Sequence, residues 1–270
     1  MSAERSAADG LPPGWLRPAW ESPGVGGLMT SRDGAGGTPP FAGFNLGPGS
    51  GDDPARVAAH RARLAAVLPA RPVWLRQVHG AAVVRLDDAD LAPGAPVHSA
   101  DAAITLRPGI ACAVLTADCL PVLFATRPGV ACAGVGAAHA GWRGLAAGVL
   151  EATVSSLCAA CGCTPRELQA WLGAAIGPRA FEVGPDVLAA FGADGSPAVA
   201  ARFRSRGAER PGRWLADLPG LAADRLQALG VGVVIDSARC TVEDAAAFYS
   251  YRRDGVTGRM AALVWMDPAR

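Results

Sequence analysis

Three short segments carry side chains that bind metal ions or act in nucleophilic catalysis. His79 directly precedes the Gly that closes the segment Trp74–Gly80, Cys119 follows the apolar run Ile110–Thr116, and His139 ends another apolar run two residues before Gly141. If these three strand-like runs end at the same place, their side chains form one His–Cys–His site. The three residues lie tens of positions apart, so their spacing alone is no metal motif, and a structural role for each stays open.

A His–Cys–His trio suits a catalytic zinc ion, because three protein ligands leave a fourth position for water or substrate. The metal would polarise an oxygen or lower the pKa of a bound water, and the cysteine would bind as a thiolate. Two alternatives remain. Cys119 is a nucleophile with His79 or His139 as its base, as in a thiol hydrolase that cleaves an amide, or the chain is a non-enzymatic metal-binding protein.

The elements that must position this site alternate between strands and helices. Asp52 or Asp53 caps a helix that Pro54 starts. Strands are expected at 72–77, 81–86, 101–106, 110–116, 121–125, 130–138, 171–176, 231–235 and 260–265, and further helices at 142–160, 185–191 and 215–229. Several strands are apolar on both faces, so we expect a single-domain α/β (α+β) layered sandwich of mixed β-sheet covered by helices. The domain is expected to span residues 25–267, after a loosely ordered lead-in at residues 1–24.

Composition narrows the function classes. Half of the 270 residues are hydrophobic and the net charge is +1, which argues against nucleic acid or an anionic membrane as partner. All 25 basic residues are Arg, which excludes Schiff-base and P-loop lysines and leaves Arg to hold any anion. The first ten residues lack an apolar signal segment, no run of about 20 apolar residues occurs, and the seven Cys are an odd number. We therefore expect a cytoplasmic protein with reduced thiols.

The chain resembles the YfiH, or laccase-domain (FAMIN-like), family. The resemblance runs from about Val25 to Met266, and its ordered segments are 44–47, 74–80, 100–102, 116–122, 139–144, 176–184 and 248–261. It implies a zinc-dependent purine nucleoside phosphorylase with purine nucleoside and phosphate as its partners, as a monomer or homodimer. It also implies adenosine deaminase and methylthioadenosine phosphorylase activities, and bacterial relatives carry a peptidoglycan-editing role. His79, Cys119 and His139 match its metal and catalytic positions.

The older name of the family, polyphenol oxidase or laccase, is discounted here, because four His in the whole chain are too few for a multicopper cluster. A Cys/His₂ site would take up copper only adventitiously. The zinc-deaminase signature H-x-E…P-C-x-x-C is also absent, so any deamination would use a different arrangement.

The resemblance also suggests further site residues. Arg32 matches an active-site arginine, although its loop, which continues to Gly37, is longer than the usual family pattern. Asp118 is expected to carry a proton or to anchor an imidazole, with a structural cap as the alternative. The expected substrate-binding residues are Asn45, Arg143, Arg179, Phe181 and Arg252, each with a turn-forming, bracing or packing role as its alternative.

Four further groups of polar residues are weaker candidates for the site. Asp101 invites the same two interpretations as Asp118. The motif Cys158-x-x-Cys161-x-Cys163 looks like half of a zinc knuckle, but no partner His or second Cys pair stands nearby. His60 falls on the apolar side of its helix and His98 in a Pro-rich loop, so both are expected to be structural or superficial.

Overall fold

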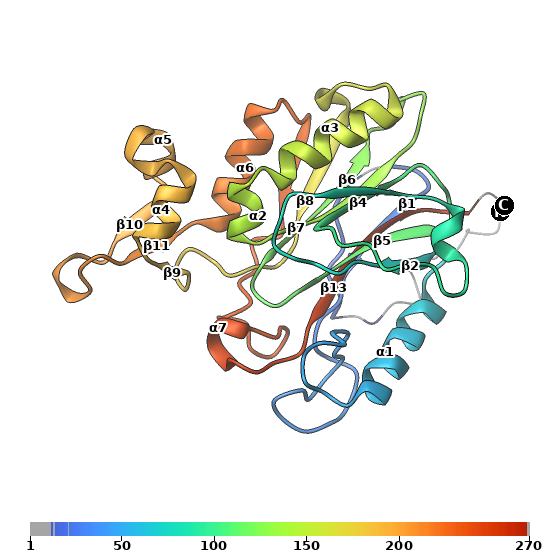
Figure 1. Cartoon of the computed structure of the whole chain (residues 1–270), viewed down its shortest axis with the longest axis horizontal. Coiled ribbons are helices and arrows are strands. Elements are labelled where there is room, and N and C mark those ends of the chain that lie inside the picture. Colours follow the sequence, from blue (N-terminus) through green and yellow to red (C-terminus); the bar gives the residue numbers. More distant parts are fainter. Residues whose placement is uncertain (1–11, 13, 21, 269–270) are drawn as a thin grey trace, which may run out of the picture.

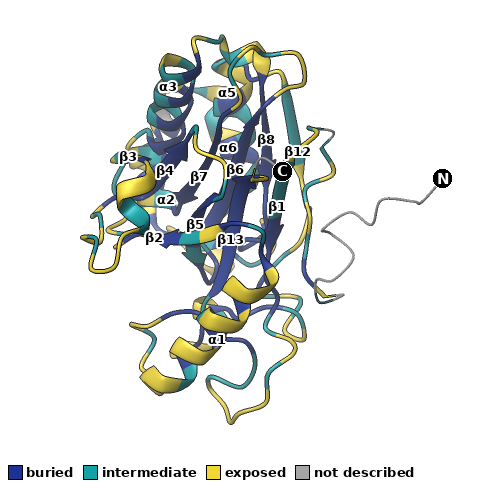
Figure 2. Cartoon of the chain, turned by 90° about the vertical axis from the view of Figure 1, so that its right-hand side faces the viewer, coloured by how far each residue is buried: buried dark blue, intermediate teal, exposed yellow. Residues whose placement is uncertain are grey.

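The computed structural model describes residue 12, residues 14–20 and residues 22–268 (Figure 1). Two mixed β-sheets stack face to face, and helices cover their outer faces (Figures 1 and 2). Within the described ranges, none of the helices combines the length and the apolar character that a membrane span requires. The layered α/β sandwich expected from the sequence is confirmed.

The first sheet has four strands in the order β1-β13-β5-β2. Their bounds are Val25–Met29 (β1), Arg71–Trp74 (β2), Ile110–Thr116 (β5) and Met260–Met266 (β13). β13 lies between β1 and β5 and is antiparallel to both, while β2 runs parallel to β5. The chain end thus forms a central strand of this sheet.

The second sheet has six strands in the order β12-β8-β6-β7-β4-β3. Their bounds are Val83–Leu86 (β3), Ala102–Thr105 (β4), Leu120–Thr126 (β6), Val135–Ala140 (β7), Leu168–Leu172 (β8) and Val233–Asp236 (β12). A three-stranded sheet of β9 (Glu182–Val183), β10 (Phe203–Ser205) and β11 (Trp214–Ala216) projects to one side (Figure 1).

Alternation along the central strands explains why they are apolar on both faces. In β5, Cys112 and Val114 face the second sheet, while Ala111 and Ala113 pack toward α1 (Pro54–Val67). The opposite face of the six-stranded sheet packs against α2 (Trp142–Ala146), α3 (Val149–Cys161), α4 (Pro185–Phe191) and α6 (Leu218–Ala228). Every residue of β6 is therefore buried, as expected for a strand covered on both sides.

Helix boundaries follow local chemistry. Asp53 caps α1 by accepting a hydrogen bond from the Ala55 amide, and Pro54 occupies the first turn, as predicted. The helix expected over 142–160 is wrong as one piece, because Gly148 adopts φ +92° and separates α2 from α3. The strand expected at 171–176 lies at 168–172 instead. The remaining helices, α5 (Pro197–Ala200) and α7 (Tyr251–Asp254), are single turns.

Part of the predicted lead-in lies outside the described residues, namely 1–11, 13 and 21. Within the described part, Trp15 is buried and its ring centroid lies 5.6 Å from that of Phe44. Leu16 exchanges two backbone hydrogen bonds of 2.9 Å with Met29. This portion therefore packs onto the four-stranded sheet.

Candidate metal centre and active site

His79 projects from the loop between β2 and β3. Its backbone has φ +61°, a left-handed conformation that is costly for a residue with a side chain. The loop is held by the buried carboxylate of Asp101, which accepts hydrogen bonds from the amides of Val78 (3.1 Å), His79 (2.9 Å) and Gly80 (2.7 Å). Asp101 thus fixes the direction in which the first imidazole points.

Cys119 lies in the tight turn that joins β5 to β6. The preceding residue, Asp118, also has a left-handed backbone, with φ +87°. Its carboxylate accepts a hydrogen bond from the Thr241 hydroxyl and another from the Arg252 amide, both at 2.6 Å. These two contacts hold the turn in its strained form and leave the neighbouring thiol facing the two imidazoles.

His139 stands near the end of β7, almost completely buried. Its Nδ1 donates to Oδ1 of Asp101 at 2.9 Å, the same carboxylate that holds the His79 loop. A protonated Nδ1 leaves the lone pair on Nε2, so the second imidazole presents Nε2 as its ligand atom. One carboxylate therefore orients both histidines.

The three side chains meet. Their ligand atoms all lie within 4.8 Å of one another, Cys119 Sγ is 3.8 Å from His79 Nε2, and the two imidazole rings pack edge to face. A tetrahedral zinc ion places its nitrogen and sulfur ligands roughly 3.3–3.7 Å apart, so small side-chain movements suffice to hold one. One thiolate, two imidazoles and a side open to a cavity are the donor set of a catalytic zinc site.

Electrostatics favours the metal-binding form of the thiol. Burial opposes ionisation, but His139 and His79 outweigh it and lower the pKa of Cys119 to about 6. Burial likewise disfavours the imidazolium, but Cys119 and Asp101 raise the pKa of His139 to about 9. The sulfur is therefore a thiolate at neutral pH, ready to bind a soft cation.

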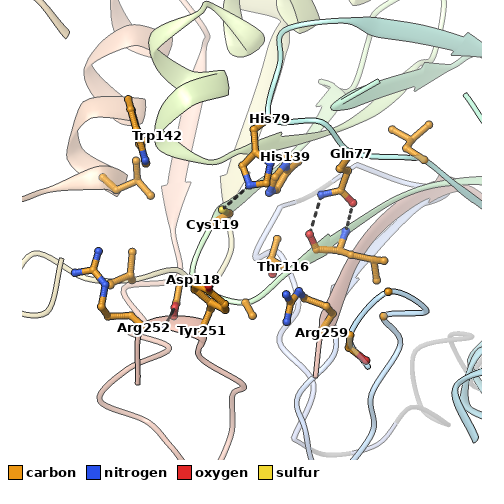
Figure 3. A pocket seen from close by; sticks show the side chains of 18 of the residues that line it. Gln77, His79, Thr116, Asp118, Cys119, His139, Trp142, Tyr251, Arg252 and Arg259 are labelled. Carbon is orange, nitrogen blue, oxygen red and sulfur yellow. Dashed lines mark hydrogen bonds between the residues drawn. The ribbon is translucent and has the colours of Figure 1, made fainter. Parts of the chain in front are cut away.

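The trio opens into a cavity of about 560 Å³. Figure 3 shows the two histidines and the Cys119 sulfur on one side of it, and Tyr251, Arg252 and Arg259 on the other. Trp142, Phe181 and Tyr251 add aromatic surface to its walls. Its size suits a small organic molecule, for which sites of about 300–1,000 Å³ are usual.

Three of the other predicted site residues line this cavity: Asp118, Phe181 and Arg252. The side chain of Asp118 is engaged by Thr241 and by the start of α7, so its position is that of an anchor. Arg252 donates from Nη1 to the Glu182 carbonyl, and its guanidinium lies 5.4 Å from the centre of the Phe181 ring.

The other four do not line the cavity. Arg32 donates to the carbonyls of Ala42 and Ala245 and packs on Tyr249. Arg143 is exposed and stacks 4.4 Å from the ring centre of Trp142. Arg179 is exposed and forms an ion pair with Glu243. These arginines have local structural partners that the sequence could not reveal.

Asn45 is buried beneath the cavity wall. Its amide nitrogen donates to the Ser50 hydroxyl (2.8 Å) and to Asp52 (2.9 Å), and its oxygen accepts from the amides of Gly47 (3.0 Å) and Arg259 (2.8 Å). It therefore ties the loop 47–50 to the start of β13.

Sequence reasoning missed Arg259, Trp142 and Tyr251 as cavity residues and left the role of Asp101 open. Arg259 carried one usable signal: in a chain without lysine, it is a cation directly before the apolar run that becomes β13. The contact of Asp101 with both histidines joins three separate segments, so only the folded chain displays it.

The remaining histidines and the cysteine motif lie elsewhere. His60 is buried and contacts the Asn45 carbonyl at 2.9 Å, and His98 pairs with Asp90. Cys158, Cys161 and Cys163 lie at the end of α3 and pack on the outer core. Within the described residues, His79, Cys119 and His139 are the group that could hold a metal ion.

Comparison with known proteins agrees with this architecture. The family model described as multi-copper polyphenol oxidoreductase laccase matches residues 27–267. A purine nucleoside phosphorylase of Pseudomonas aeruginosa is 49% identical over 94% of this chain and 98% of its own length. The purine nucleoside phosphorylase YfiH of Escherichia coli is 48% identical over 92% of this chain and 97% of its own.

Solved structures give the same result. The crystal structure of a Neisseria meningitidis protein matches with a TM-score of 0.85 and 40% identity, and covers 94% of this chain and 100% of that one. YlmD from Geobacillus stearothermophilus matches with a TM-score of 0.83 and 32% identity, over 94% of this chain and 96% of its own. The chain therefore belongs to the YfiH family, whose matching model is described as multi-copper polyphenol oxidoreductase laccase.

Proposed function

We propose that this protein is a zinc-dependent purine nucleoside phosphorylase. The observation that carries the proposal is the His79–Cys119–His139 group, which offers one thiolate and two imidazoles at the wall of a cavity of nucleoside size. Relatives of 48% and 49% identity over nearly the whole chain bear the name purine nucleoside phosphorylase. A bound zinc ion would supply Lewis-acid polarisation of an oxygen in this cavity.

The residues of the chain have separate tasks in this proposal. Asp101 keeps the proton of His139 on Nδ1 and holds the His79 loop. Trp142 and Tyr251 offer aromatic surface for a purine, while the ring of Phe181 is buried beneath Arg252.

Adenosine deamination and methylthioadenosine phosphorolysis belong to the same proposal, as activities of the same cavity. Both would act on a purine nucleoside held in the same cavity, at C1′ in the phosphorolysis and at C6 in the deamination. Product analysis separates the three reactions, because deamination gives inosine, whereas the two phosphorolyses give adenine with either ribose 1-phosphate or 5-methylthioribose 1-phosphate.

The test is product chromatography of adenosine, inosine and methylthioadenosine, each incubated with and without phosphate. We expect free base and the sugar 1-phosphate only with phosphate, and inosine from adenosine in both buffers. Cys119→Ala should abolish product and bound zinc together, whereas His98→Ala, a histidine paired with Asp90 away from the trio, should alter neither. Full activity of the Cys119 variant would contradict the proposal.

A thiol hydrolase acting on an amide or a peptidoglycan fragment is the second candidate. The lowered pKa of Cys119 beside His139 favours it, because a thiolate–imidazolium pair is also a nucleophile with its acid. Metal removal distinguishes the two candidates. Chelation should stop phosphorolysis until zinc returns, whereas a thiol hydrolase would survive chelation and lose its activity to iodoacetamide.

A further inference from the structure

Arg259 is a half-buried cation in the cavity wall. It stands directly before β13 and faces the cavity from the side opposite the histidines (Figure 3). Burial lowers the pKa of its guanidinium, while the nearby Cys119 and Asp118 act in the opposite direction. A cation in a partly desolvated wall is costly unless an anion comes to it.

The hydrogen bonds of Arg259 engage one end of its guanidinium. Nη1 donates to the carbonyls of Thr257 (2.8 Å) and Gly258 (2.9 Å), and the backbone amide donates to Asn45 (2.8 Å). Nε and Nη2 have no acceptor among the residues that the structure describes, and no described carboxylate pairs with this side chain. The Nε–Nη2 edge of an arginine can donate two parallel hydrogen bonds to one oxyanion, and in Arg259 this edge is free to do so.

The other two arginines in the cavity wall are exposed. Arg76 points both Nε and Nη2 at the Ser99 hydroxyl. Arg252 donates from Nη1 to the Glu182 carbonyl and lies over the Phe181 ring, while its Nε–Nη2 edge faces solvent-exposed surroundings without an acceptor among the described residues. Arg259 is therefore the half-buried cavity arginine whose Nε–Nη2 edge has no acceptor within the described part of the chain.

A second donor lies beside it, in the loop 47–50. The Ser50 hydroxyl accepts from Asn45 (2.8 Å) and from the Asp52 amide (3.4 Å), which leaves its own proton for a ligand. The loop is packed against Arg259 so closely that a Cβ on Gly47 would lie 2.5 Å from Arg259 Cγ. Asn45 holds both the loop and the Arg259 backbone, so the two donors form one built unit.

We propose that Arg259 and Ser50 form the binding site for inorganic phosphate, in a cavity that Arg32, Arg143 and Arg179 do not line. This inference rests on the proposed function, because phosphate is the co-substrate of phosphorolysis. A phosphate oxygen bonds to C1′ of the nucleoside as the C1′–N9 bond breaks. The purine keeps the electron pair of that bond and takes up the proton that phosphate loses, which gives ribose 1-phosphate and the free base.

Calorimetric titration of inorganic phosphate into the zinc-loaded protein tests this directly. Arg259→Gln should weaken phosphate binding by about 10- to 150-fold, as expected for loss of a charge-assisted pair of hydrogen bonds, with zinc content unchanged. The phosphate affinity of Arg259→Lys should lie between those of the wild type and Arg259→Gln, because lysine keeps the positive charge but lacks the two-pronged guanidinium. The matched control is Arg107→Gln, which removes a surface arginine paired with Asp88 at the far end of the strands.

Kinetics must agree with binding. In Arg259→Gln the KM for phosphate should rise by the same factor, while the KM for the nucleoside stays within about twofold. Phosphate affinity unchanged in this variant would overturn the inference and leave the proposed phosphorolysis standing. Phosphate binding that depends on Arg259 in a protein without any phosphorolysis would instead support the anion site and refute the proposed function.

A measurement on the unaltered protein covers the case in which the variants fold poorly. Arginine-specific dicarbonyl labelling, read by peptide mass spectrometry, should show that phosphate protects Arg259 and does not protect Arg107. Equal labelling with and without phosphate would overturn the inference. A 5′-phosphate of a nucleotide is the other source of the same oxyanion. Stronger protection by adenosine 5′-monophosphate than by phosphate with adenosine would assign the site to nucleotides and overturn the phosphate proposal.

Discussion

Asp101→Asn tests whether one buried carboxylate organises the metal centre. In the native chain Oδ1 accepts from the His79 amide and from His139 Nδ1, and Oδ2 accepts from the amides of Val78 and Gly80. An asparagine keeps the shape but replaces one oxygen with an NH₂ group. Whichever way the amide turns, two of the four donors lose their acceptor.

The magnitude follows from these bonds. A hydrogen bond to a charged group contributes about 1.5–3 kcal/mol, so losing two of them should lower the free energy of unfolding by about 3–5 kcal/mol. If the NH₂ group faces His139, the imidazole shifts its proton to Nε2, the atom that would bind the proposed metal. Zinc affinity should then fall about 10- to 100-fold, as for other partners of metal-bound histidines.

The assays are urea unfolding and a competitive zinc titration with a chromophoric chelator. Asp87→Asn is the matched control, because Asp87 accepts a backbone hydrogen bond at an exposed turn far from the trio, and Asn caps such turns equally well. Zinc affinity within twofold of the wild type, together with a stability loss below about 1 kcal/mol, would refute the role assigned to Asp101.

Acid provides an independent measurement of the same group. Burial opposes ionisation of Asp101, but the hydrogen bonds from His139 and from the loop amides outweigh it and hold its pKa below the usual value. The unfolded chain, with an aspartate pKa of about 3.9, therefore binds more protons than the folded chain as pH falls. This stabilisation is present above about pH 4 and is lost below it, so the stability gap between wild type and Asp101→Asn should narrow in that range.

Three further predictions follow from contacts in and around the site. Gly141→Ala should lower zinc affinity with little loss of stability, because its φ of −60° suits alanine while the new Cβ would lie 2.8 Å from Cys119 Sγ; unchanged zinc binding in a chelator titration would contradict this packing. Asn45→Ala should lower the free energy of unfolding in urea by about 2–4 kcal/mol and raise the KM for phosphate, because the Arg259 amide before β13 loses its acceptor. A loss of stability with an unchanged KM would show that Asn45 does not support the Arg259 site. Cys161→Ala should keep full zinc stoichiometry by elemental analysis, because this thiol packs at the end of α3 outside the trio; loss of one zinc would show that the ligands are assigned wrongly.

The sequence by itself predicted most of the central strands and the three residues of the candidate metal site. Runs such as Ile110–Thr116 are apolar at every position, which predicts strands buried on both faces, and the strand β5 has these same bounds. His79, Cys119 and His139 each lie at or after the end of a strand-like run, and the structure brings them together. Strand patterns and side-chain chemistry can be read along the chain, and the family resemblance joined the three residues into one candidate site.

Only the tertiary structure decided which charged side chains serve the site. Arg32, Arg143 and Arg179 were candidates of the same kind as Arg259 in the sequence. In the fold Arg32 donates to the Ala42 and Ala245 carbonyls, Arg143 stacks on Trp142, and Arg179 pairs with Glu243. Asp101 reaches His139 across 38 positions, and Asn45 reaches Arg259 across 214. Whether a cation is paired or free depends on such distant contacts, and a distant contact exists only once the chain has folded.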